Sequence, residues 1–234
     1  MTEKKLIEPA RETQATQLTN RLRTDIVSCD IAPGEKLRME FLREKYGAGG
    51  SPVREALNRL VAEGFVVQSD QRGFRAAPVS LDEMQDLTLA RVWIGESALR
   101  ASIQNGDDAW EDRVVLAFHR WERAQKRGMD VNSSEMHALH ANLHREILSD
   151  CGSRRMLGFW DTSFDYAQRY QAMSQQAHHG QKRDTLKEHR DIMEAALDRD
   201  VETCARLHRA HLELTADIVK ALESTFNPPD TDES

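Results

Sequence analysis

Three short apolar patterns, each closed by a turn signal, occupy the first third of the chain and restrict its fold more than any other feature. The first repeats every four residues, as one face of a helix does, and consists of Leu18, Leu22 and Ile26. Pro33-Gly34 breaks it, and a second apolar set follows, which consists of Leu37, Phe41, Leu42 and Tyr46. Because residues 47–50 contain three glycines, they end this second helix.

A third helix is expected from about Gly50. Ser51 before Pro52 is a favourable helix start, and Gly64 is placed as the residue that ends it. Its buried face consists of Val53, Leu57, Leu60 and Val61. Two short strands, 65–67 and 74–76, then flank a polar hairpin tip at 68–73. Three short helices and a β-hairpin predict a winged helix-turn-helix domain over residues 12–78, after a flexible N-terminus at 1–11.

The rest of the chain has almost no strand signal. Ser80 with Glu83 forms a capping box for a helix over 81–105, and residues 106–108 end that helix and cap the next. Further helices are expected near 108–127, 135–150, 153–175, 184–199 and 201–223. We therefore predict a mainly α protein with an antiparallel all-helical bundle at 79–225, followed by a disordered tail at 226–234.

The charge of the chain is divided unequally between these two parts. The whole chain has 32 Lys+Arg and 39 Asp+Glu, a formal charge of −7, which taken alone argues against nucleic-acid binding. Residues 1–78, however, contain 13 basic and 11 acidic side chains, so the acidity resides in the bundle. The average therefore conceals a mildly basic first domain that suits DNA.

Nothing in the sequence indicates a membrane or an oxidising compartment. No apolar run approaches the roughly 18 residues of a membrane helix, and the polar first eleven residues lack an apolar signal core. The three cysteines, Cys29, Cys151 and Cys204, form no CxxC pair. We expect a cytoplasmic protein without a membrane partner.

The arginines of the first domain are candidates for DNA contact. A helix-turn-helix places its recognition helix in the major groove, where Arg54 could donate two hydrogen bonds to guanine and Arg59 lies one turn further on. Arg38 and Arg43 on the preceding helix suit phosphates. Arg72-Gly73 at the hairpin tip could reach the minor groove. A solvated surface role is the alternative for each of these side chains.

The histidines all lie in the second part. His140 and His144 are four residues apart, so they project from one face of a helix, while His189 and His211 lie on two later helices. Imidazoles from three helices could converge on one transition metal. Spacing alone leaves the alternative open, because helical histidines are more often surface or core residues.

Four segments of the first domain resemble the DNA-binding domain of GntR-family bacterial transcription regulators over about residues 15–78. They are Gly34-Glu35-Lys36-Leu37, Pro52-Val53-Arg54-Glu55-Ala56-Leu57, Arg59-Leu60 and Glu63-Gly64. Members of the family commonly have a triplet such as Ser-Arg-Thr before the proline, and its arginine often contacts DNA. Here the triplet is Gly49-Gly50-Ser51, so we expect no such base contact. The two glycines, Gly49 and Gly50, instead expose backbone N–H groups at a helix N-terminus, which suits a phosphate. Gly50 and Ser51 are therefore candidates for DNA contact.

Residues 80–223 resemble the all-helical effector domain of the FadR-type branch of that family, the FCD domain. The resemblance rests on the segments 140–148 with 151–153, 188–200 and 208–212. It implies a divalent metal held by an Asp-x3-His pair and two later histidines. His144, His189 and His211 match the three histidines, and His140 stands where Asp is usual. Four imidazoles favour Zn²⁺ or Ni²⁺ over Mg²⁺ or Mn²⁺ and leave the ion its full charge, which should attract an anionic effector.

Our hypothesis is that the open positions of this metal take a carboxylate, so we expect a small organic acid as the effector. The resemblance adds one candidate side chain. It places Arg91 facing the cavity, where the guanidinium could bind a carboxylate bidentately; a surface ion pair is the alternative. Tyr166, Arg169 and Tyr170, on the predicted helix 153–175, are candidates to line the same pocket, with packing as the alternative for the tyrosines. The protein that the resemblance implies is a ligand-responsive homodimeric regulator, most often a repressor, on a palindromic double-stranded DNA operator.

Two other functions remain open from the residues themselves. A four-histidine site with one free position could activate water in a hydrolytic metalloenzyme, although the chain has no HExxH motif. A regulator of the same fold could also bind its effector directly through the histidines, without a metal.

Overall fold

The computed structural model describes residues 12–69, 73–131, 133–177 and 183–221. The expected flexible N-terminus, the whole of the expected tail at 226–234 and Arg72 lie outside these ranges. The chain divides into two compact units. The first extends to Ile26 and resumes at Asp30–Pro78, whereas the second comprises Val27–Cys29 and the chain from Val79 onward.

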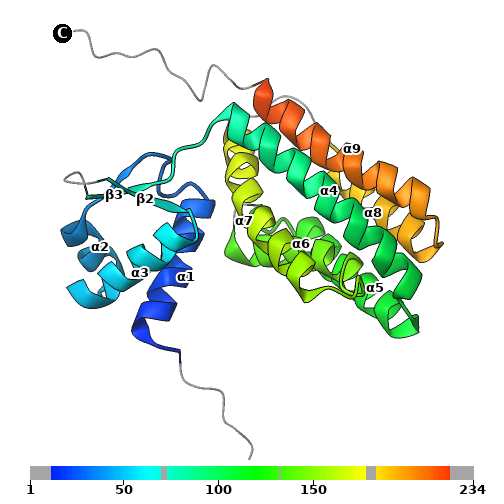
Figure 1. Ribbon diagram of the computed structural model, residues 1–234, viewed down its shortest axis with the longest axis horizontal. Helices are drawn as coiled ribbons and strands as arrows, with labels where there is room; N and C mark the ends of the chain where they lie inside the picture. The colour runs from blue at the N-terminus through cyan, green and yellow to red at the C-terminus, as the bar shows by residue number, and fades with distance from the viewer. Residues whose placement is uncertain (1–11, 70–72, 132, 178–182, 222–234) are drawn as a thin grey trace, which may run out of the picture. The chain divides into compact units, whose positions relative to one another are not determined.

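The first unit has the predicted winged helix-turn-helix architecture (Figure 1). Its elements are α1 (Gln14–Val27), β1 (Lys36–Leu37), α2 (Met39–Tyr46), α3 (Gly50–Ala62), β2 (Val66–Ser69) and β3 (Gly73–Ala76). The strands form one antiparallel sheet in the order β1-β3-β2. Leu22, Ile26, Leu57 and Leu60 are fully buried, so the apolar faces predicted for α1 and α3 form the core.

The second apolar set of the sequence divides between a strand and a helix. Leu37 was expected on the second helix, but it lies in β1, where it pairs with Phe74 and is buried. Phe41, expected on the same buried face, is 47% exposed. Pairing with β3 keeps residue 37 extended, so α2 starts only at Met39 and buries Leu42 and Tyr46. The small sheet therefore has one strand more than the predicted hairpin.

The second unit is an all-helical bundle, as predicted. Its helices are α4 (Leu81–Asn105), α5 (Asp108–Lys126), α6 (Ser134–Ile147), α7 (Arg154–Ala177), α8 (Thr185–Leu197) and α9 (Val201–Lys220). Helix α4 lies along α9 and packs also on α7, while α5 packs on α6 and α8 on α9 (Figure 1). Among the described residues, no helix has the length and apolarity needed to cross a membrane.

The helix starts in this unit are those that the sequence predicts. The Ser80 hydroxyl accepts a hydrogen bond from the backbone N–H of Glu83 at 3.1 Å, and the Asp107 carboxylate accepts one from that of Trp110 at 3.0 Å. Each bond satisfies a backbone donor that the first turn of a helix leaves unpaired. The bounds of α4 and α5 follow from these caps.

Two apolar clusters hold the bundle together. The larger one surrounds the buried rings of Trp110, Trp121 and Trp160. The smaller one, formed by Met84, Tyr170 and Val219, lies near the start of α4. Trp93, in contrast, is 62% exposed.

Candidate functional site

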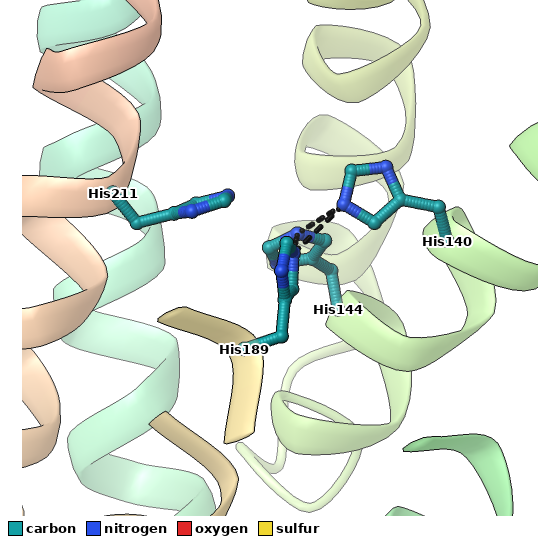
Figure 2. A group of neighbouring side chains, drawn as sticks. All are labelled: His140, His144, His189 and His211. Carbon is teal, nitrogen blue, oxygen red and sulfur yellow. Dashed lines mark hydrogen bonds between the residues drawn. The ribbon is translucent and has the colours of Figure 1, made fainter. Parts of the chain in front are cut away.

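Four buried histidines from three helices point at one another inside the bundle (Figure 2). His140 and His144 lie one turn apart on α6 and project from the same face, as their spacing predicts. His189 comes from α8 and His211 from α9. Each of the four offers a ring nitrogen, and these nitrogens all lie within 4.8 Å of one another.

Three of the ring nitrogens form a tight triangle. The Nε2 atoms of His140 and His189 are 2.8 Å apart, and that of His144 is 3.1 Å from each of them. Nitrogen ligands at about 2.0–2.1 Å from a common ion are separated by about 3 Å when they occupy neighbouring positions around it. The triangle therefore has the dimensions of a set of metal ligands.

The partners of the other ring nitrogens determine which nitrogen is free. The Nδ1 atom of His189 lies 2.6 Å from the carbonyl oxygen of Thr185, which can only accept, so this nitrogen carries the proton. The Nδ1 atom of His211 lies 2.8 Å from a carboxylate oxygen of Glu188 and 3.1 Å from a guanidinium nitrogen of Arg183. The carboxylate can only accept and is the nearer partner, so Nδ1 of His211 donates to Glu188. In both rings Nε2 is then an unprotonated lone pair directed to the centre, which is the arrangement that metal-ligating histidines adopt.

No placement of protons gives a hydrogen bond to each of the three pairs of Nε2 atoms in this triangle. The Nε2 atom of His189 is unprotonated, so His140 and His144 can each donate to it, but their own Nε2 atoms then face each other with two hydrogens. Burial lowers the pKa of all four rings below the ordinary value of histidine, to about 4 for His189, and the neighbouring rings lower that of His140, His144 and His211 further. The rings are neutral at pH 7, and the donor set fits a divalent cation.

A small cavity adjoins the histidines. It has a volume of about 60 Å³, enough for a few water-sized groups, and its lining includes His140, His189, His211, Gln168, Gln171 and Arg183. Arg183 is held in place there, because its guanidinium donates to both carboxylate oxygens of Glu188 at 2.6–2.7 Å and to the Thr215 hydroxyl at 2.8 Å.

Glu188 and Arg183 are site residues that the sequence did not reveal. Glu188 directly precedes His189 in the chain, but its side chain contacts His211 of the next helix instead. The Glu-His sequence was visible, whereas the contact across helices follows only from the packing of α8 on α9.

Arg91 of α4, which was expected to face the cavity, is buried with 7% of its surface exposed, but it is not among the residues that line this cavity. Its guanidinium carbon lies 5.1 Å from the centre of the Trp160 ring and 5.5 Å from that of Phe164. Within the described ranges it has no carboxylate partner, and its Nε atom has no hydrogen bond. Burial lowers the pKa of Arg91 to about 10, so the side chain remains a cation at neutral pH.

The other three expected effector residues do not line the cavity either. Tyr170 donates instead to the Glu83 carboxylate at 2.6 Å beside the start of α4, and both Tyr166 and Arg169 are absent from the lining. Residues two apart point to nearly opposite sides of a helix, so the stripe of α7 that faces the cavity carries Gln168 and Gln171. The Gln168 amide lies 3.4 Å from Nδ1 of His140. Tyr166, Arg169 and Tyr170 therefore lie on other sides of α7 than the residues that line this cavity.

The first unit presents several of the expected DNA-contact side chains. Arg54, on the second turn of α3, is exposed, as are Arg38 and Arg43. Arg59 is less free, because it donates to Glu55 at 2.6 Å and to Thr16 at 3.0 Å. At the start of α3, no side chain caps the helix.

Glycines determine the backbone conformation at the other expected DNA contacts, which are the start of α3 and the start of β3. Gly50 and Ser51 form the first residues of α3 after Gly49, which is extended. Gly73 opens β3 with a φ of +79°, a conformation that glycine adopts without strain. Arg72 lies outside the described residues.

Comparison with known proteins agrees with this division of the chain. Residues 14–75 match the family described as bacterial regulatory proteins, gntR family, and residues 86–214 match the FCD domain. The chain is 36% identical over 203 residues to the uncharacterized HTH-type transcriptional regulator BphR of Paraburkholderia xenovorans, covering 86% of this chain and 82% of that protein. It is 31% identical over 199 residues to the HTH-type transcriptional repressor GlaR of Escherichia coli, covering 82% and 89%.

Solved structures share the fold at lower sequence identity. McbR/YncC of Escherichia coli superposes with a TM-score of 0.77 at 16% identity, covering 93% of this chain and all of that one. A GntR transcriptional regulator from Rhodococcus sp. RHA1 superposes with a TM-score of 0.73 at 19% identity, covering 90% and 99%. At these identities the likeness concerns the fold alone.

Proposed function

Because the chain belongs to the GntR family of bacterial transcription regulators and carries an FCD domain, we propose that it is a repressor released by a small carboxylate effector. The family and the names of the relatives indicate transcription regulators and not enzymes. One relative, GlaR, is itself named a repressor, which supports repression over activation in this proposal.

In this proposal the first unit binds DNA as one half of a homodimer on a palindromic operator. Arg54 reads a base in the major groove, and the N-terminus of α3 at Gly50 and Ser51 holds a phosphate. Arg38 and Arg43 add phosphate contacts, and Arg72-Gly73 contacts the minor groove. Arg59 would have to leave Glu55 to reach DNA, so we expect it to contribute less than Arg54.

Variants of the two arginines test this assignment. Replacing Arg54 by alanine should lower the affinity for the protein's own upstream region and relax preference at one base pair, a loss of about 1–3 kcal/mol. Replacing Arg59 should have a smaller effect. Fluorescence anisotropy with labelled DNA at several salt concentrations measures both, and equal losses for the two variants would contradict the proposed difference.

The four histidines would hold a divalent transition metal, with Zn²⁺ or Ni²⁺ as the best match for nitrogen ligands. Such an ion supplies a positive centre that can accept a carboxylate oxygen from the effector. The observation that carries this assignment is the Nε2 triangle of His140, His144 and His189, together with the orientation of His211 by Glu188. Arg91 would neutralise the effector's carboxylate.

Elemental analysis of the purified protein tests the metal site. We expect the wild-type protein to retain close to one metal ion per chain, and His144→Ala to lose both the ion and the response of DNA binding to an effector. His119→Ala is the control, because His119 is exposed and does not belong to the ligand set. Full metal content in the His144 variant would exclude the site.

The homodimer needs an apolar surface, and the second unit exposes two large rings. Trp93 of α4 is 62% exposed and Phe159 of α7 is 63% exposed, on two helices that pack together. Large exposed aromatic side chains are typical of interfaces. We expect Trp93→Glu to shift the protein toward monomer in analytical ultracentrifugation, and an unchanged dimer would place the interface elsewhere.

A further inference from the structure

A second group of polar atoms lies buried beside the histidines, and none of its members has a hydrogen-bond partner among the described residues. They are Nε of Arg91, Nε1 of Trp160, both ring nitrogens of His208 and Nδ1 of His144. Native proteins pair the large majority of their buried polar side-chain atoms. Several unpaired atoms in one place therefore indicate a group that the protein alone does not supply.

The four side chains come from four helices and adjoin one another. The guanidinium of Arg91 lies over the Trp160 ring at 5.1 Å, and the centre of that ring is 5.4 Å from the centre of His208. The ring of His144 lies 6.0 Å from Trp160 and 6.1 Å from His208. Arg91, Trp160 and His208 are absent from the lining of the cavity that contains Arg183, so this group is separate from that lining.

The chemistry of these atoms indicates what would pair with them. Arginine and the indole nitrogen of tryptophan only donate hydrogen bonds, and neutral histidine donates one and accepts one. Arg91 also carries a positive charge that no carboxylate of the described residues neutralises. A ligand that satisfies this set must offer acceptor oxygens and a negative charge, as a carboxylate does.

Gly95 shows that the chain is shaped to place His208 here. A Cβ atom at residue 95 would lie 2.5 Å from Cε1 of His208 and 3.0 Å from the Trp160 ring. Only a glycine on α4 lets the imidazole approach the helix so closely. Any larger residue at position 95 would therefore exclude the His208 ring from this place.

We propose that Trp160 and His208 bind the acid group of the effector together with Arg91 and so determine which acids the protein recognises. One carboxylate oxygen accepts from Arg91 and the other from Nε1 of Trp160, while His208 hydrogen-bonds to the same group. This inference rests on the proposed function only in that the ligand is the effector of the repressor. It gives binding roles to two side chains whose type and position in the sequence suggest only packing.

The indole N–H resonances offer a direct test, since the chain has only four tryptophans. We would label the protein with [¹⁵N]tryptophan and titrate the purified protein, as isolated, with acetate, the smallest stable carboxylate of this class, at an ionic strength held constant with chloride. The indole proton of Trp160, assigned with Trp160→Phe, should move downfield as it begins to donate. The resonance of Trp110, which already donates to the Glu146 carbonyl at 3.0 Å, should stay in place. A Trp160 resonance that acetate leaves unchanged would overturn the proposal.

Affinity measurements on variants provide the second readout. Trp160→Phe and His208→Leu should each weaken acetate binding about tenfold or more, while His208→Asn, which keeps a donor and an acceptor, should recover part of the loss. Trp110→Phe is the matched control, because it removes another buried indole N–H and should leave the affinity unchanged. If Trp160→Phe and His208→Leu bind acetate as the wild type does, with circular dichroism confirming their fold, the proposal is wrong.

DNA binding, measured in the same samples, separates this inference from the proposed function. A shift of the Trp160 resonance without any effect of acetate on DNA affinity would support the binding site and contradict the repressor mechanism. Release from DNA by acetate with an unchanged Trp160 resonance would support the repressor mechanism and contradict the binding site at Trp160.

Discussion

Replacing Arg91 with methionine should make the ligand-free protein more stable, although Arg91 is proposed to bind the effector. Burial lowers its pKa from 12.5 to about 10, which means that the folded protein holds the cation less favourably than the unfolded chain does. Each pKa unit corresponds to about 1.4 kcal/mol, so the unsatisfied charge destabilises the fold by about 3 kcal/mol. Methionine has a similar length and packs well against aromatic rings.

The gain is partly offset by the loss of the contact with Trp160. A buried cation over an indole ring contributes about 2 kcal/mol, so the net increase in the free energy of unfolding should be about 1 kcal/mol. For a chain of this size, that corresponds to a rise in Tm of about 2–4 °C. Urea denaturation followed by tryptophan fluorescence measures the change in the helical unit, because all four tryptophans lie there.

Arg100→Met provides the control on the same helix. Arg100 is exposed and paired with Glu202, so its replacement should change the stability by no more than about 0.5 kcal/mol. If Arg91→Met instead destabilises the ligand-free protein by more than about 1 kcal/mol, the charge of Arg91 is already satisfied in the folded state. Arg91 would then need no anion at this position.

Three further variants or treatments test other contacts of the second unit. Glu188→Gln should lower metal affinity by about tenfold or more, because the neutral amide orients His211 less strongly. Competition with a chelator measures this affinity, and an unchanged value would show that Glu188 does not support the site. Gly106→Ala should destabilise the bundle by about 1–3 kcal/mol in urea, since the new Cβ would lie 2.5 Å from the Trp110 ring, and an unchanged midpoint would refute this. Burial raises the pKa of the Cys204 thiol to about 12. Iodoacetamide at pH 8 should therefore modify Cys204 only after unfolding. Rapid labelling of Cys204 in the folded protein would contradict its burial.

The sequence predicted those features that depend on local rules. The caps at Ser80 and Asp107 follow from the preference of short polar side chains for the first turn of a helix, and both are present. The shared face of His140 and His144 follows from the geometry of a single helix. Such features need no knowledge of which helices become neighbours.

Features that depend on packing between helices were not predictable in the same way. Leu37 joined a strand because Phe74, 37 residues later, pairs with it. Gln168 faces the cavity in preference to Tyr170 because the rotation of α7 about its own axis is set by its neighbours α4, α6 and α9. The stacking of Arg91 on Trp160 joins residues 69 positions apart, and no spacing rule connects them.

Helix α7 makes two contacts that are mechanically linked. Gln168 touches His140, and Tyr170, two residues later, holds the carboxylate of Glu83 in the first turn of α4, just after the chain leaves Pro78 of the first unit. Less than one turn of helix, about 3 Å of rise, separates the two side chains. Because so short a stretch of helix is stiff, a rotation of α7 that changes the contact of Gln168 with His140 also strains the hydrogen bond between Tyr170 and Glu83, within the second unit.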